Sequence, residues 1–106
     1  MQARFIYEGN AVEFLADTEI AAGTVVVQGS LVGITKVDIP AGSLGVLHLV
    51  GVYDVEKSNV AIPIGSKVYW DNTAKKATLN ATGNSQLGIA IIAATTDDPI
   101  VRIKLT

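Results

Sequence analysis

β-Branched residues and glycine are abundant in this 106-residue chain and favour β-strands joined by turns. It contains 13 valines, 11 isoleucines and 9 threonines, with 10 glycines spread among them. β-Branched side chains are stiff at χ1 and pack well on a pleated surface, whereas glycine permits tight turns. The sequence therefore predicts an all-β protein made of short strands.

Three small-residue turns each lead into a strand-like run. They are Ala22-Gly23-Thr24, Ala41-Gly42-Ser43 and Ile64-Gly65-Ser66. Glycine also recurs inside the apolar stretches, at Gly33, Gly51 and Gly88, where it is typical of a bulge, a bend or a close approach of two backbones. The unequal spacings exclude a solenoid of fixed period. We expect a small β-barrel or sandwich of glycine-bent strands, with residues 1–106 in a single domain.

Alternation of apolar and polar residues, together with turn residues, predicts where the strands lie. The expected ranges are 4–8, 11–16, 24–28, 31–37, 44–55, 67–71, 76–80, 86–93 and 100–105. In one of them Val68 and Trp70 share a face, and in the last Ile103 and Leu105 alternate with basic residues. Both patterns predict strands with one buried face.

Two segments near the N-terminus have more than one interpretation. Residues 11–22 also fit a helix, because Asn10 and Glu13 resemble a capping box. The alternation of apolar and acidic residues there favours a strand followed by a loop. Residues 2–8 form either an extended N-terminal arm or an edge strand of the domain.

Composition limits the partners and the chemistry. Without cysteine the chain has no disulfide framework, thiolate zinc site or thiol nucleophile. A net charge of −2 argues against nucleic acid as a partner, since nucleic-acid-binding domains usually carry a basic face. The longest run of apolar residues and glycine, 87–94, is too short to cross a bilayer. No targeting segment is recognisable, so we expect no membrane partner and no secretion.

The charges are divided unevenly along the chain. Residues 1–56 hold seven acidic and two basic residues, a net charge of −5, and residues 57–106 hold six basic and three acidic residues, a net charge of +3. One interpretation is complementarity between copies of the chain or with a larger assembly. The other is that two strand faces simply differ in charge.

No set of residues forms a recognisable catalytic or metal-binding motif. His48 is the only histidine and lies between two leucines, with no carboxylate close in sequence. Asp97 and Asp98 precede a proline and are explained by a turn. We expect no enzymatic activity, no cofactor and no metal. An enzyme with active sites between the subunits of a trimeric β-barrel would need several convergent titratable groups, which the sequence does not supply around His48.

Tyr69 and Trp70 are the best candidates for a ligand platform. Three lysines lie near them in sequence, and a small β-barrel module could stack a sugar on the two aromatic rings. That function requires Trp70 to face solvent. Core packing or a subunit interface is the alternative use of the same side chains.

The order of the glycine-bearing segments is itself distinctive. It begins with Ile20–Val27 and ends with Val101–Leu105, and its most specific pieces are Gly65-Ser66-Lys67-Val68-Tyr69-Trp70-Asp71 and Leu87-Gly88-Ile89-Ala90. From about Glu8 to Thr106 the chain resembles the phage and prophage proteins described as capsid cement, or head decoration, proteins. Some of these carry an older label as RecA-type recombinases, which the absence of a phosphate-binding loop does not favour here.

This resemblance implies a compact β fold that assembles as homotrimers on the outside of an icosahedral phage head. The implied partner is the major capsid protein, the implied location is the virion, and synthesis is in the cytoplasm of the host bacterium. The expected role is structural. The candidate interaction residues are Arg4, Phe5, Tyr7, His48, Tyr69 and Trp70.

The most specific of these expectations concerns the N-terminal segment. Phe5 and Tyr7 lie on one face of an extended segment, and Arg4 and Ile6 lie on the other. Such a segment could add to an exposed strand edge on the capsid shell, using backbone hydrogen bonds for affinity. The alternative is that it closes the protein's own barrel.

Overall fold

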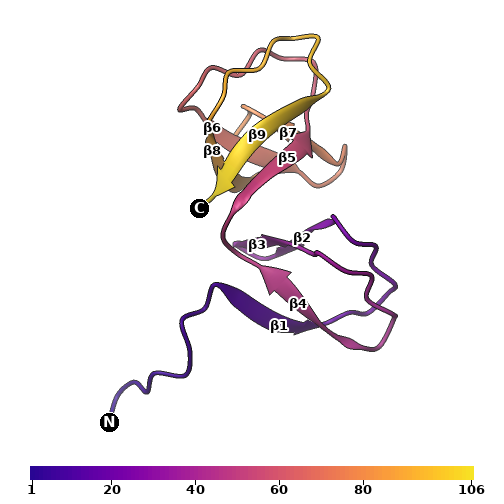
Figure 1. Ribbon diagram of the computed structural model, residues 1–106, viewed down its shortest axis with the longest axis vertical. Helices are drawn as coiled ribbons and strands as arrows, with labels where there is room; N and C mark the ends of the chain where they lie inside the picture. Colours follow the sequence, from indigo (N-terminus) through magenta and orange to yellow (C-terminus); the bar gives the residue numbers. More distant parts are fainter.

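Strands and loops without any helix make up the computed structural model, which describes residues 1–106 (Figure 1). The strands are β1 (Ala11–Leu15), β2 (Val25–Gln28), β3 (Leu31–Ile34), β4 (Leu44–His48), β5 (Val52–Glu56), β6 (Lys67–Asp71), β7 (Lys76–Thr78), β8 (Ser85–Ala90) and β9 (Ile100–Leu105). The prediction of an all-β fold is confirmed. The helical alternative for residues 11–22 is not found, because β1 pairs with β4 there.

The strands form two antiparallel sheets. The first has four strands in the order β1-β4-β3-β2, and the second has five in the order β5-β9-β8-β6-β7. Neither sheet closes on itself, so the arrangement is that of a sandwich. The second sheet nevertheless curls until its two edges meet at one bridge, between Lys57 and Ala77.

The larger of two apolar cores joins both sheets. Val32 and Ile34 of β3 pack in it with inward-facing residues of the second sheet, among them Val68 and Trp70. A smaller core lies within the first sheet and comprises Phe14, Ala16, Ile39 and Leu47. The alternation predicted for the last strand is confirmed, because every second residue of β9 is buried.

The three small-residue turns share one hydrogen-bonding pattern. In each, the glycine N–H donates to a carbonyl of a neighbouring segment, and the same segment donates back to the residue after the glycine. The pairs are Gly23 and Thr24 with Thr35, Gly42 and Ser43 with Ala16, and Gly65 and Ser66 with Ala90, at 2.7–3.0 Å. The three glycines have φ between +78° and +82°, a conformation that side chains with a Cβ rarely adopt. The repeated sequence signal thus corresponds to a repeated structural unit.

Two of the predicted strands differ in the structure. The range 44–55 divides into β4 and β5, because the chain turns at Gly51 (φ +122°) and passes from the first sheet to the second. Alternation along one unbroken strand would place His48 on a single face with Val46, Val50 and Val52. In the structure His48 shares the outer face of β4 with Val46, and Val52 lies on β5 in the other sheet. The other strands agree with their expected ranges within a few residues.

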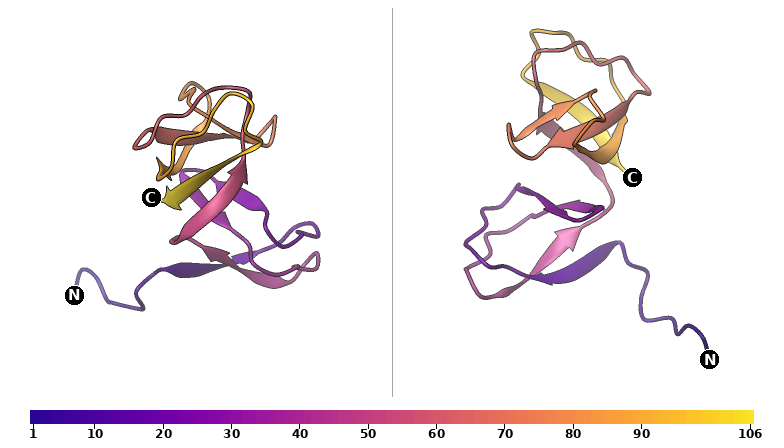
Figure 2. Two further views of the ribbon diagram at one scale, coloured as in Figure 1. Left: turned by 45° about the horizontal axis from the view of Figure 1, so that its top comes forward. Right: turned by 180° about the vertical axis from the view of Figure 1, so that it is seen from behind.

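Residues 4–8 form no strand. The chain before Gly9 runs away from both sheets in every view (Figure 2), so it does not close the protein's own sheet. Residues 2–8 lie outside the strands of both sheets.

Candidate functional site

The N-terminal arm, residues 1–8, exposes large apolar side chains. Phe5 is 73% exposed, Ile6 64% and Tyr7 50%. No backbone hydrogen bond involves a residue before Asn10, whose carbonyl accepts from the N–H of Leu49. The arm thus presents unpaired backbone groups and apolar side chains together, which are the two features that strand addition to a partner uses.

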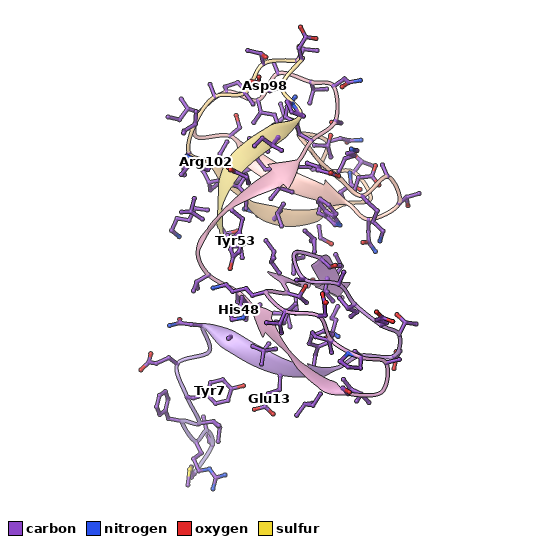
Figure 3. The ribbon with its side chains drawn as sticks, turned by 45° about the vertical axis from the view of Figure 1, so that its right-hand side comes forward. Tyr7, Glu13, His48, Tyr53, Asp98 and Arg102 are labelled. Carbon is purple, nitrogen blue, oxygen red and sulfur yellow. The ribbon has the colours of Figure 1, made fainter.

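His48 ends β4, opposite Ala11 of β1. Its side chain is half-buried, and no ion pair or side-chain hydrogen bond involves its imidazole (Figure 3). No group of three or more histidine and carboxylate side chains is placed to hold a metal ion. The structure does not bring His48 together with the arm residues or with the two aromatic residues of β6.

Tyr69 and Trp70 do not form a platform. As neighbours on β6 they point to opposite faces of the sheet, and Trp70 is only 6% exposed. Its indole Nε1 donates to the Asn72 side-chain oxygen at 3.2 Å, and the same oxygen accepts from Lys75 Nζ at 2.9 Å. Trp70 is therefore a core residue, and the exposed aromatic surface that sugar binding requires is absent at this position.

A cleft of about 440 Å³ lies between the two sheets. Its apolar wall comes from both sheets and includes Ile34, Tyr53 and Trp70. The charged residues Asp54, Glu56 and Lys75 also line the cleft. The sequence does not predict this cleft, because its walls come from four separate segments between residues 23 and 75 that carry no shared motif.

Two carboxylates have perturbed acidities, each with a visible cause. The side-chain hydrogen bond from Arg102 lowers the pKa of Asp54, and Asp54 in turn raises the pKa of the guanidinium. The backbone N–H of Thr95 donates to Asp98 at 2.7 Å and lowers the pKa of that carboxyl. Both carboxylates are held in the charged form by structural hydrogen bonds, as in a network that orders strands and loops.

Exposed apolar side chains also lie outside the arm, on the outer face of β1 and β4. Leu15 lies directly opposite Leu44, and the two are 61% and 65% exposed. Val46 and His48 lie on the same face, farther along β4. The two leucines are not among the residues predicted to contact a partner, although their outward positions in the strand alternation were a usable signal.

A comparison with protein families gives one match for this chain. A family described as phage cement protein matches residues 6–105. The chain belongs to the phage cement protein family. No curated protein and no solved structure matches significantly.

As a phage cement protein, the chain has a structural, capsid-associated role. The matched region of this phage cement protein includes Ile6 and Tyr7 of the arm and begins after Arg4 and Phe5. None of its elements is a helix with the length and apolar character to cross a bilayer. For such a protein, the surfaces that contact neighbouring proteins are the functional site.

Proposed function

We propose that this protein attaches, as a homotrimer, to the outer surface of an assembled phage head and stabilises the head without catalytic turnover. Its partner is the major capsid protein, and its location is the virion after synthesis in the host bacterial cytoplasm, from a phage or a prophage. Family membership supports the association with the capsid. The mode of attachment is argued from the arm.

The observation that carries the mode of attachment is the exposed arm. Its large apolar side chains, Phe5, Ile6 and Tyr7, are at least half exposed. Leaving such side chains in water is unfavourable, and burying one in a partner contributes about 1.5–3 kcal/mol. An extended arm can pair with a free strand edge of the shell, with Phe5 and Tyr7 on one side and Arg4 on the other.

Many identical copies on one particle increase the effect of a modest contact. A trimer presents three arms at once, and the second and third contacts form at a high effective concentration. The chain acts in this proposal as one domain, since the larger core joins both sheets. A rigid body that carries a short extended arm fits attachment to a repetitive surface.

The test is co-sedimentation with undecorated heads of the phage concerned. Copies bound per head are measured over a range of protein concentrations, and deleting residues 2–8 should raise the apparent Kd by at least about tenfold, given the apolar area that the arm exposes. The double variant Phe5→Ala/Tyr7→Ala should give most of this loss. Leu79→Ala, which alters an exposed leucine in the loop after β7, is the matched control and should bind normally.

Stabilisation is measured as the temperature at which heads release their genome. Bound wild-type protein should raise this temperature, and the deletion variant should not. Wild-type protein that never binds heads contradicts the proposed function. A folded deletion variant that binds and stabilises heads like the wild type contradicts only the role of the arm and leaves the proposed function in place.

A further inference from the structure

The outer face of the first sheet combines apolar side chains with an acid. We call Glu13, Leu15, Leu44 and Val46 the acidic face. The register places Glu13 opposite Val46 and Leu15 opposite Leu44, so the carboxylate is surrounded by three exposed apolar side chains. All four residues are exposed, and Glu13 forms no ion pair within the chain.

The outer face of the second sheet has the opposite charge. We call Val52, Lys67, Ile89 and Lys104 the basic face. The register aligns them in one row across four strands, with Lys67 opposite Ile89, Ile89 opposite Lys104, and Lys104 opposite Val52. Neither lysine forms an ion pair within the chain. Here one apolar residue lies between two unpaired ammonium groups.

A shallow hollow of about 240 Å³ adjoins the basic face. Its lining includes Ile92 and Ile100, which are 51% and 43% exposed. The charged residues in the lining are Arg102, Asp54, which pairs with Arg102, and Asp98, which accepts from the Thr95 N–H. Apolar side chains of a neighbouring protein would bury these isoleucines. The hollow and the row together offer a larger apolar surface than the row alone.

One chain cannot satisfy both faces by itself. Glu13 and Arg102 lie towards opposite ends of the molecule and on different sheets (Figure 3). The two faces are complementary in both hydrophobicity and charge. Each has exposed apolar side chains, beside an unpaired carboxylate on the acidic face and beside unpaired ammonium groups on the basic face. A second copy of the chain carries the complementary face by necessity.

We propose that the acidic face of one copy packs on the basic face of the next, in a head-to-tail contact between copies. Glu13 then lies near Lys67 and Lys104, and Leu15 and Leu44 cover Ile89 and the hollow. A head-to-tail contact uses two different surfaces on each chain and closes into a ring when the rotation between copies permits. The inference rests on the proposed homotrimer and names the surfaces that build it.

Charge exchange provides a direct test by solution mass and self-association. Wild-type protein should have three times the 11.1 kDa chain mass. Glu13→Lys and Lys104→Glu should each weaken self-association by at least about tenfold, because each brings like charges together. The double variant Glu13→Lys/Lys104→Glu restores opposite charges across the same contact and should recover most of the oligomer. High salt should weaken the wild-type contact and relieve the defect of the single variants.

An apolar pair of variants tests the remainder of the contact. Leu44→Asp should give a folded monomer, whereas Leu79→Asp, which alters an exposed leucine outside both faces, should leave the oligomer intact. Circular dichroism confirms folding in each case. A wild-type monomer, single variants with unchanged mass, or a double variant as weak as the single ones would overturn the inference. Head binding by wild-type protein is measured in parallel, so failure of the contact between copies is distinguished from failure of the proposed function.

Discussion

Arg102 on β9 lies directly opposite Asp54 on β5 and binds both of its carboxylate oxygens. The guanidinium donates from Nε to Oδ1 at 2.8 Å and from Nη2 to Oδ2 at 3.2 Å. A two-pronged pair of this kind fixes the relative orientation of the side chains as well as their distance. The pair lies on the outer face of the second sheet, in the row of residues next to that of Lys104. Arg102 thus has an ion-pair partner within the chain, whereas Lys67 and Lys104 have none.

Removing the guanidinium should restore an ordinary acidity to Asp54. In Arg102→Met we expect the pKa of the Asp54 carboxyl to rise towards 3.8, because the hydrogen bond from Arg102 is the main cause of its lowering. Carbon-detected NMR titration of this carboxyl measures the change. An unchanged titration would show that the ion pair does not persist in solution.

The sign of the accompanying pH effect follows from the lowered pKa. The wild-type pair contributes stability that is fully present above about pH 3.8 and is lost as the pH falls through the lower pKa of the folded state. The free energies of unfolding of wild type and Arg102→Met should therefore differ at neutral pH and converge in acid. Both side chains are substantially exposed, so the difference should be small.

Lys57 organises the loop before β9 from a buried position. Its side chain is 4% exposed, and Nζ donates to the carbonyls of Thr95 at 2.8 Å and Asp98 at 3.0 Å. Lys57→Met leaves these carbonyls without their donor and should reduce the free energy of unfolding by about 1–3 kcal/mol. Urea denaturation measures the loss. Lys36→Met, at an exposed position without an ion pair and outside both faces, is the control and should change stability little.

Gly88 on β8 allows a close approach between strands. A Cβ at this position would collide with the backbone carbonyl of Lys104 on β9, and a backbone cannot move aside without disturbing the ladder. Gly88→Ala should therefore destabilise the fold by about 1–3 kcal/mol, towards the upper end of that range. At Gly45 the obstacle is the flexible side chain of Ile39, so Gly45→Ala should cost less. Equal losses in thermal or urea unfolding would contradict this explanation.

The two sheets should unfold together. Val32 and Ile34 of the first sheet are buried among residues of the second, so loss of one sheet exposes the core of the other. Fluorescence of Trp70, the only tryptophan, reports on the second sheet, and the methyl signals of Leu47 report on the first. Their denaturation midpoints should coincide. Separate midpoints would instead indicate two independent folding units.

Much of the local structure follows from patterns within a few residues. The buried and exposed alternation of β9 and the three glycine turns were predictable, because each depends on side-chain period or on backbone conformation at one glycine. The hydrogen bonds that the turns share were not predicted, because their partners Thr35, Ala16 and Ala90 lie in other segments of the chain. The division of 44–55 at Gly51 was not recognised, since a glycine in an apolar run signals a bulge, a bend or a crossing between sheets without distinguishing them.

The candidate contact surfaces could be predicted only in part from the sequence. Exposure of the arm agrees with one of two interpretations of residues 2–8, and the burial of Trp70 decided between platform and core. The outer faces were missed as surfaces. Glu13 and Leu44 are 31 positions apart in the sequence, and only the pairing of β1 with β4 brings them onto one face.

By itself, the sequence determined the strand-rich composition, the turns and the uneven division of charge, because these depend on residue type and short-range spacing. Only the tertiary structure decided which charges stand unpaired beside which apolar residues. Strand order and register within the second sheet place Lys67 and Lys104 in one row. No local pattern records a pairing between strands that are distant in the chain.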